Sequence, residues 1–419
     1  MSRPRLLPVL LSLITVTSIN AADWPTFRGP DRNGETLDTA IPLEWGPDKN
    51  VRWKTKLPAP GNSSPIVVAD RVFLTCAQDK DGTRRSLICF DRATGKELWT
   101  KTVTLDEHEP THEVNPYCAS TPASDGQRVI GWHGSAGLHC YDLAGNELWN
   151  TDLGRFRHIW GYGSSPLIHN DRVFLNCGPG ARSFVACLDK QTGKLLWQTD
   201  EPGGKDDGGP NWLGSWSTPL ITTINGADQL LVFQSGKVNA YDPKTGKILY
   251  THTGAGPLAY TDVMTTTIEG TGPVGLALAG YGGKGVGFKL GGNGDTTPTH
   301  RLWQSSVKPP QRIGSGIVRD RYLFLPNETG IECLDVLTGK QLWFHRERGQ
   351  TFWASLVATP DRIYAISQQG TTYVFAPDPK EWKLLATNPL NERTNSTPAP
   401  SGNQLFLRTA QHLYCVEQQ

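Results

Sequence analysis

The sequence predicts an all-β fold, an eight-bladed β-propeller built from four-stranded antiparallel blades. A turn-and-strand segment, clearest as Asp91-Arg-Ala-Thr-Gly-Lys-Glu-Leu-Trp99, recurs along the 419 residues at spacings of 40 to 53. Such a period without a 3.6-residue pattern is typical of propellers rather than helical solenoids. The 45 glycines, 30 prolines and 14 tryptophans, beside only two methionines, also favour a fold rich in turns and strands.

The recurring segment supplies the outermost strand, strand D, of each predicted blade. Its Asp accepts hydrogen bonds from backbone N–H groups of the turn, its Gly supplies a positive φ, and Leu-Trp begins a strand with a large ring to bury. Further copies end at Trp149, Trp197, Tyr250 and Trp343, and weaker ones at Trp303 and Leu385.

Three inner strands complete each predicted unit. Strand A follows a Ser-x-Pro element such as Ser63-Ser-Pro65, strand B resembles Arg71-Val-Phe-Leu, and strand C resembles Leu87-Ile-Cys89-Phe-Asp91. The Ser-x-Pro element and the strand-D segment each occur eight times when degenerate copies are counted, which indicates eight blades. The C-terminus stops one strand short, and Val51-Arg-Trp53 is a strand D without companions. Pairing the two removes two open sheet edges, so we expect residues 51–419 to form one ring closed by its first strand.

Two segments precede the predicted ring. Residues 1–22 have basic Arg3 and Arg5, an apolar stretch of 14 residues and small residues at 21 and 22, a pattern typical of a signal peptide. The alternative is an uncleaved anchor, although a membrane helix needs about 20 apolar residues. Residues 23–50 are expected to be a leader that packs on the propeller. We expect an exported monomer, periplasmic or secreted, with no transmembrane segment after cleavage.

The charges are balanced, with 41 Lys and Arg against 40 Asp and Glu. This balance argues against nucleic acid as a partner, because such partners attract strongly basic proteins.

The eight cysteines allow two interpretations in an oxidising compartment. Cys76 with Cys89, and Cys177 with Cys187, occupy matching positions in consecutive predicted strands and could form disulfides. Alternatively, the strand-C position needs only a small buried side chain, since Ala240 fills it in another copy. The absence of any Cys-x-x-Cys argues against thioredoxin-like and zinc-ribbon chemistry.

With these motifs the chain resembles the PQQ-like, or quinoprotein-type, β-propellers. The opening Asp23-Trp-Pro-Thr-Phe-Arg-Gly-Pro-Asp31-Arg-Asn-Gly34 looks like the leader of exported members abundant in planctomycete-type bacteria. The resemblance implies that the strand-D tryptophans dock against the next blade. They are Trp53, Trp99, Trp149, Trp197, Trp303 and Trp343.

Two kinds of relatives carry different functional implications. PQQ-dependent alcohol dehydrogenases are longer and have two adjacent cysteines beside the quinone, whereas no two cysteines are adjacent here. The propeller lipoprotein of the outer-membrane β-barrel assembly machinery is similar in size and blade number. It is anchored through an N-terminal cysteine, while the first cysteine here is Cys76.

Antiparallel order places the D–A and B–C connections on one face of the ring, where loops carry function most often. The candidate ligand-binding residues on this face are His112, Asn115, Tyr117, His158, Trp160, Tyr162, Trp212, Trp216, Arg312 and Trp353. The aromatic members either floor a pocket for a planar or sugar ligand or pack around the channel mouth.

The segment from His108 to Glu113 also allows two interpretations. His108, Glu109, His112 and Glu113 could ligate a divalent metal, with His112 as a possible general base, or they could form a solvated polar loop. No strict ligand spacing is present, so we expect no metal site. No catalytic residues are assigned.

The sequence therefore predicts an exported, non-catalytic propeller that binds a protein or a small ligand in the cell envelope, without a cofactor. The alternative is a PQQ- or metal-dependent oxidoreductase resembling the quinoprotein alcohol dehydrogenases, with PQQ and Ca²⁺ as cofactors.

Overall fold

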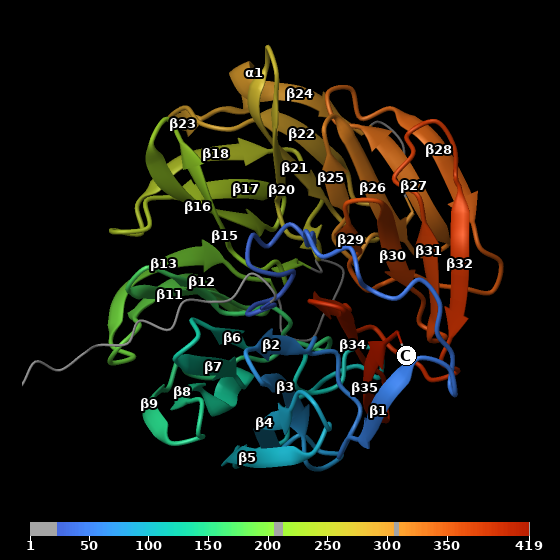
Figure 1. Ribbon diagram of the computed structural model, residues 1–419. Helices are drawn as coiled ribbons and strands as arrows, with labels where there is room; N and C mark the ends of the chain where they lie inside the picture. The colour runs from blue at the N-terminus through green and yellow to red at the C-terminus, as the bar shows by residue number, and fades with distance from the viewer. Residues whose placement is uncertain (1–22, 205–212, 306–309, 419) are drawn as a thin grey trace, which may run out of the picture.

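The computed structural model describes residues 23–204, 213–305 and 310–418. In this part of the chain eight antiparallel sheets are arranged around a central axis, which confirms the predicted eight-bladed propeller (Figure 1). The predicted signal peptide, residues 1–22, and the candidate residue Trp212 lie outside the described residues. No helix in the described ranges has the length and apolar character needed to cross a membrane.

Each of the first seven blades places strands A to D in chain order from the axis outward. The first four blades are β2 (Ile66–Val68), β3 (Arg71–Ala77), β4 (Arg84–Asp91) and β5 (Glu97–Thr104); β6 (Ala123–Ser124), β7 (Arg128–Trp132), β8 (Leu138–Asp142) and β9 (Glu147–Thr151); β10 (Leu167–His169), β11 (Arg172–Cys177), β12 (Arg182–Asp189) and β13 (Leu195–Pro202); and β15 (Leu220–Ile224), β16 (Ala227–Gln234), β17 (Lys237–Tyr241) and β18 (Ile248–Thr253).

The last four blades follow the same plan. They are β20 (Met264–Ile268), β21 (Gly272–Leu278), β22 (Gly285–Lys289) and β24 (Arg301–Gln304); β25 (Ile317–Arg319), β26 (Tyr322–Asn327), β27 (Gly330–Asp335) and β28 (Gln341–Arg346); β29 (Val357–Thr359), β30 (Arg362–Ile366), β31 (Thr371–Phe375) and β32 (Leu384–Pro389); and β33 (Ala399–Ser401), β34 (Gln404–Arg408), β35 (His412–Glu417) and β1 (Val51–Lys56). Short extra elements are β14 (Gly214–Ser215), β19 (Leu258–Ala259), β23 (Gly294–Asp295), the 3₁₀ helix η1 (Gly134–Ala136) and α1 (Thr297–His300).

The ring closes as expected, because β1 is the outer strand of the last blade. It runs antiparallel to β35, with Trp53 opposite Cys415 and Thr55 opposite Leu413 (Figure 1). This pairing gives the last blade its fourth strand and covers the edge of β35.

The repeated turn before strand D has the geometry that its residues predict. Asp91 Oδ1 accepts hydrogen bonds from the backbone N–H of Thr94 at 2.8 Å and from its hydroxyl at 2.6 Å. Gly95 has a φ of +71°. The ring of Trp53 from the preceding blade packs on this glycine, where an added Cβ would lie 2.5 Å from the indole.

The strand-D tryptophans dock against the next blade, which confirms the expectation from the family resemblance. Trp53 Nε1 donates to the Arg92 carbonyl at 2.9 Å, in the turn of blade one. The same bond joins Trp99 to Leu143, Trp149 to Lys190, Trp197 to Pro243, Trp303 to Val336 and Trp343 to Asp378. Turn and tryptophan therefore form one inter-blade joint, repeated around the ring.

Of the two interpretations of the cysteines, the disulfide interpretation is wrong for both pairs. Within the first hairpin Cys76 lies opposite Ser86, and Cys89 lies opposite Phe73. In the third blade Cys177 lies opposite Phe184, and Cys187 opposite Phe174. All eight cysteines are buried free thiols, which supports the alternative that the strand-C position holds a small buried side chain.

A closed ring of eight hydrogen bonds surrounds the axis where the inner strands begin. In each bond the backbone N–H of one blade donates to the side-chain oxygen of the equivalent residue in the next blade, at 2.8 to 3.2 Å. Its members in order are Ser64, Thr121, Ser165, Thr218, Asp262, Ser315, Ser355 and Thr397, which donates back to Ser64. We call these residues the axial ring. Asp262 is its one carboxylate.

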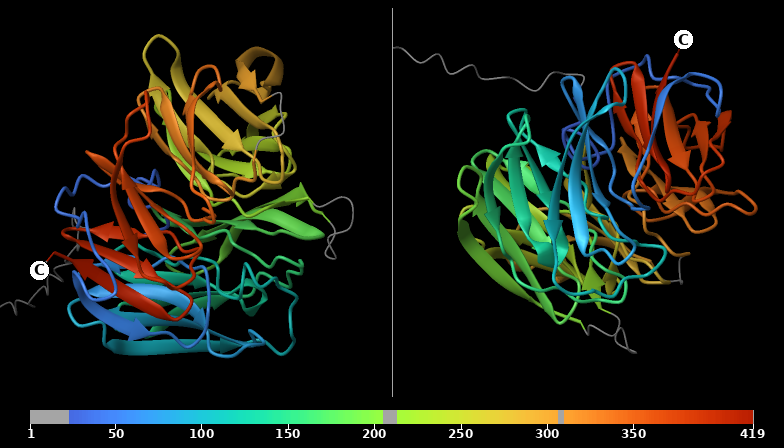
Figure 2. Two further views of the ribbon diagram at one scale, coloured as in Figure 1. Left: turned by 90° about the vertical axis from the view of Figure 1, so that its right-hand side faces the viewer. Right: turned by 90° about the horizontal axis from the view of Figure 1, so that it is seen from below.

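The leader, residues 23–50, crosses one face of the propeller. Trp24 pairs with Val67 in blade one, Arg32 donates to the Ile168 carbonyl in blade three, and Glu35 bridges to Ala358 in blade seven. These blades are on different sides of the axis, and Figure 1 shows the dark blue segment lying over the centre of the ring. In the left view of Figure 2 it lies at one face of the molecule. The leader therefore covers one end of the axial channel.

Candidate ligand-binding site

All eight D–A connections meet at one cavity on the axis, with a volume of about 250 Å³. Five of the predicted residues line it, and they come from four different connections: His112, Asn115, Trp160, Trp216 and Trp353. Others that line it were not singled out from the sequence, chief among them Phe27, Asn62, Tyr260, Asp262, Tyr281 and Asn395. Phe27 belongs to the leader, which therefore contributes to the lining.

One wall of the cavity is aromatic. Trp160 stacks on Tyr281 with ring centroids 5.5 Å apart and planes 13° apart. Trp216 and Tyr260 are 4.9 Å apart and tilted by 54°. The predicted residue His158 is buried behind this wall, edge-on to Trp216 at 5.2 Å. The four rings come from three blade connections and one B–C hairpin, so the wall depends on closure of the ring.

Tyr281 is held in an unusual backbone conformation to join this wall. Its φ is +46°, a left-handed value that bulky residues rarely adopt. The residue is 55% exposed, yet its ring stacks on Trp160. A Cβ at the preceding Gly280 would lie 2.3 Å from Tyr260, so the chain approaches this ring closely. Backbone strain of this kind concentrates at binding and catalytic sites.

The asparagines at the rim hold the loops together. Asn115 Nδ2 donates to the carbonyls of Trp160 at 2.7 Å and Tyr162 at 3.1 Å. Asn62 and Asn395 each donate from Nδ2 to the Val114 carbonyl at 3.0 Å. Their amide groups are thus used to fix the connections that surround the cavity.

Asp262 is the only Asp, Glu, Lys or Arg among the described residues that line the cavity. Its Oδ1 accepts from the Thr218 backbone N–H at 2.8 Å, and its own N–H donates to Ser315 Oγ at 2.9 Å. The residue is 8% exposed. Burial raises the pKa of the carboxyl to about 6, although the nearby Arg28 guanidinium and the Thr218 N–H both act to lower it.

Arg28 belongs to the leader and is itself buried. Its Nη2 donates to the carbonyls of Asn33 at 2.7 Å and Gly316 at 2.6 Å, while Nη1 is buried without a partner among the described residues. Burial lowers its pKa to about 10, so it remains a cation at neutral pH. No ion pair between Arg28 and Asp262 is found within the described residues.

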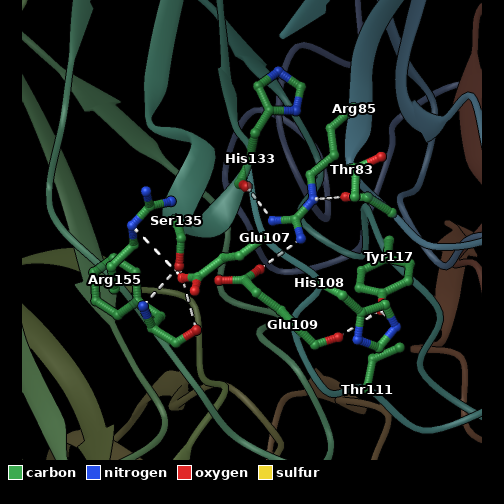
Figure 3. A network of polar contacts seen from close by, with 12 residues as sticks. Thr83, Arg85, Glu107, His108, Glu109, Thr111, Tyr117, His133, Ser135 and Arg155 are labelled. Atoms are coloured by element: carbon green, nitrogen blue, oxygen red, sulfur yellow. Dashed lines mark hydrogen bonds and ion pairs between the residues drawn. The ribbon is translucent and has the colours of Figure 1, made fainter. Parts of the chain in front are cut away.

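Two predicted residues, Tyr117 and Tyr162, lie away from the cavity, beside the buried ion pair of Arg85 and Glu109. Figure 3 shows this ion pair together with Tyr117. Arg85 donates to Glu109 Oε2 at 2.5 Å and to the His133 carbonyl at 2.6 Å. Its guanidinium lies over the Tyr117 ring at 5.2 Å and the Tyr162 ring at 5.7 Å. The two tyrosines are therefore part of the support beneath the D–A connections.

The same network bears on the His108 to Glu113 segment. Tyr117 donates to the Glu109 carbonyl at 2.5 Å, and His108 Nε2 lies 3.1 Å from the same hydroxyl. Glu109 is buried, so the solvated-loop interpretation is wrong for it. His112 is exposed, and its Nδ1 accepts from the Val114 N–H at 3.3 Å. No group of three or more His, Cys, Asp or Glu suited to a metal occurs in the described ranges.

Arg312 also has a supporting position. It makes a buried bidentate ion pair with Glu332, at 2.8 Å from Nε to Oε1 and 3.1 Å from Nη2 to Oε2. Its neighbours Gln311 and Ile313 line the cavity instead. The ion pair fixes the connection between blades five and six.

Asp262 had one detectable signal in the sequence. Its segment, Thr261-Asp262-Val263-Met264, occupies the position of the Ser-x-Pro element in a degenerate blade. An acidic residue where seven equivalents carry hydroxyls marks the position as exceptional. Tyr260 and Tyr281 gave no such signal, since neither lies in a repeated motif.

Comparison with known proteins supports the fold and identifies the family. The family model described as "Outer membrane protein assembly factor BamB" matches residues 44–103 and 83–345, more than half of the chain. Polyvinylalcohol dehydrogenase from a Pseudomonas species is 24% identical over 236 residues, which are 48% of this chain and 36% of that protein. The chain thus spans about a third of the length of this curated relative.

Solved structures of low sequence identity share the fold. A europium-containing methanol dehydrogenase has a TM-score of 0.66 at 14% identity, covering 92% of this chain and 89% of that one. BamB from Moraxella catarrhalis has a TM-score of 0.61 at 16% identity, covering 88% of this chain and 97% of that one. Together with the matching family model, the repeated Asp-x-x-Thr-Gly-Lys-x-Leu-Trp units show that the chain belongs to the PQQ-like β-propeller family.

Proposed function

We propose that this protein is a non-catalytic binding propeller of the cell envelope whose axial cavity takes a small ligand. The observation that supports this most directly is the convergence of all eight D–A connections on one cavity with an aromatic wall and a single carboxylate. Concave sites with mostly apolar walls and a few polar groups are where small ligands bind in proteins. The rim amides and the buried ion pairs hold this cavity in shape before a ligand arrives.

The oxidoreductase alternative requires PQQ with Ca²⁺, and the lining residues do not fit that pair. PQQ carries three carboxylates, which call for Arg or Lys partners. The described lining residues include neither, and Asp262 would repel the cofactor. Ca²⁺ takes six to eight oxygen ligands. No cluster of three acidic or histidine ligands exists among the described residues. The donor set thus favours binding without this cofactor.

The location and partner are part of the same proposal. Arg3, Arg5 and the apolar stretch after them support export to the periplasm or beyond. The family, whose model carries the name of an outer membrane assembly factor, supports an envelope protein as a second partner. We propose a monomeric protein, since one chain closes the ring on itself.

The test combines ligand screening with a cofactor assay on the purified chain. Crystals of wild type and Trp160→Ala are soaked with a mixed small-molecule collection, and hits are ranked by thermal shift. A ligand at 100 times its Kd stabilises the fold by about 2.7 kcal/mol. We expect hits in the axial cavity that Trp160→Ala abolishes and that Trp382→Ala, an aromatic variant remote from the cavity, retains.

The cofactor arm separates binding from catalysis. Wild type is incubated with PQQ and Ca²⁺ and monitored by quinone absorbance and by dye reduction with alcohols. We expect neither binding nor reduction. Micromolar PQQ binding together with alcohol-dependent dye reduction would establish the oxidoreductase alternative and overturn the proposed function.

A further inference from the structure

We propose that the ligand of the axial cavity is a small organic cation, a methylated or quaternary ammonium group held between the aromatic wall and the Asp262 carboxylate. This inference rests on the proposed function, because it assumes that the cavity binds a ligand. It adds the chemical class of that ligand.

The charge of the cavity lining favours a cationic ligand. Asp262 Oδ1 is engaged by the Thr218 N–H, whereas no hydrogen bond to Oδ2 is found within the described residues. Arg28 acts on this carboxylate from the leader side, but its Nη2 and Nε bind backbone carbonyls, and its unpartnered Nη1 makes no ion pair with Asp262 among the described residues. A buried carboxylate without a direct cationic partner is unfavourable, and a cationic ligand would supply that partner.

The aromatic wall also favours a cationic ligand. Aromatic faces attract cations through the negative charge above the ring, and sites for quaternary ammonium groups are built from several such rings. Trp160, Trp216, Tyr260 and Tyr281 form a contacting cluster, and Trp353 lines the cavity from another connection. Burial raises the pKa of Tyr260 far above neutrality, so its phenol is uncharged. Tyr281 joins the cluster despite its left-handed φ.

Other classes of ligand fit the lining residues less well. An anion would meet Asp262 as the charged group on the lining. A sugar needs several free hydrogen-bonding side chains, but the Nδ2 groups of Asn62, Asn115 and Asn395 already donate to loop carbonyls. A bare metal ion needs more oxygen ligands than Asp262 supplies. The volume of about 250 Å³ admits only a small molecule.

The experiment measures binding of choline and of 3,3-dimethylbutan-1-ol, its uncharged isostere, by calorimetry. The two probes have nearly the same shape, so their difference reports the charge. At about pH 7.5 we expect wild type to bind choline at least about tenfold more tightly than the alcohol. Asp262→Asn should lose most of this preference. Asp320→Asn, which removes a carboxylate on a remote turn where Asn also tolerates the left-handed φ, should keep it.

The pH dependence gives a second readout that a purely structural role of Asp262 would not move. Choline should bind wild type more weakly at about pH 5, where Asp262 is protonated, and the loss should vanish in Asp262→Asn. The other titratable groups around this carboxylate are Arg28 from the leader, His112 across the cavity, and Tyr260 and Tyr281 from the wall. Asp262→Asn leaves all four in place and so isolates the contribution of Asp262.

The results of these experiments distinguish failure of the cation inference from failure of the proposed binding function. Equal affinity for choline and the alcohol, or an unchanged preference in Asp262→Asn, overturns the cation inference and leaves ligand binding intact. No detectable choline binding up to about 10 mM also overturns it. The soaked crystals then decide the wider proposal independently, because an anionic or neutral hit in the cavity keeps the binding function, while an empty cavity removes both.

Discussion

Replacing Asp262 by Asn isolates the cost of one buried carboxylate in the axial ring. The amide cannot ionise, while its Oδ1 still accepts the Thr218 N–H. In the wild type, burial raises the carboxyl pKa from 3.8 to about 6. An Asp in the unfolded chain titrates near 3.9. The folded state therefore holds this proton more tightly than the unfolded state does.

The sign and size of the effect follow from this difference. The contribution of Asp262 to stability is fully present below about pH 4 and is lost as the pH rises through about 6. A difference of about two pKa units corresponds to roughly 3 kcal/mol. We therefore expect the stability of Asp262→Asn relative to wild type to improve by about 3 kcal/mol between about pH 4 and pH 7.

Urea unfolding monitored by tryptophan fluorescence measures this difference at several pH values. All other titrating groups are common to both proteins, so they cancel in the comparison. Asp262→Ser, which restores the hydroxyl of the other axial positions, is the matched control and should follow Asp262→Asn. Two stability curves that stay parallel from pH 4 to 7 would refute the reasoning, because Asp262 would then titrate alike in both states.

Three further substitutions test the joints of the ring. Trp53→Phe removes the indole donor at the closing blade and should cost about 1 kcal/mol by calorimetry, whereas no loss would mean that closure does not use this bond. In Gly193→Ala the new Cβ is strained by the φ of +70° and would lie 2.4 Å from the Trp149 ring, whereas in Gly226→Ala it meets only the strain of φ +77°. We therefore expect Gly193→Ala to lower the free energy of unfolding by about 2 kcal/mol more than Gly226→Ala. Equal losses in urea unfolding would contradict a packing role for this glycine. Hydrogen bonds to Glu392 outweigh its burial and lower its pKa to about 2, so this carboxylate contributes stability that is lost as the pH falls from about 4.5 to 2. In acid titration of the melting temperature, Glu392→Gln should therefore lose less stability than wild type, and equal losses would contradict the assignment.

The blade number and the closure were predictable because their signals are local and repeated. An Asp-led turn, a glycine with positive φ and a docking Trp recur together, so each copy reinforces the assignment of the others. The unaccompanied strand around Trp53 is then expected beside the incomplete last blade, because pairing there removes two open sheet edges. The structure places it there, opposite Cys415.

The candidate site was only partly predictable, because the direction in which a loop side chain points is not part of the repeated sequence pattern. Trp160 and Trp353 reach the cavity, while Tyr117 and Tyr162, on the same kind of connection, turn toward the buried Arg85. A sequence pattern cannot distinguish the two directions, since both bury an aromatic ring. Asp262 is hard to identify from the sequence because its blade lacks the Ser-x-Pro element that marks the position in other blades.

The disulfide interpretation of the two cysteine pairs was wrong for a different reason. Equal positions in consecutive strands suggested that the thiols face each other, but the register of a hairpin depends on where its turn lies. In the first blade that turn sets Cys76 against Ser86, three positions away from Cys89. Pairing across a hairpin therefore needs the turn residues as well as the strands.

The pairing of β1 with β35 also sets an order of events during synthesis. Thr55 is among the first residues of the ring to be made, and its partner Leu413 is among the last. Until the C-terminal hairpin emerges, the first strand has no sheet to join, and the leader lacks blade seven as one of its supports. Contacts of such long sequence separation form slowly. A chain that terminates early should thus expose the unpaired backbone groups of β1 near its N-terminus. Quality-control proteases could then bind this strand, far from the premature C-terminus.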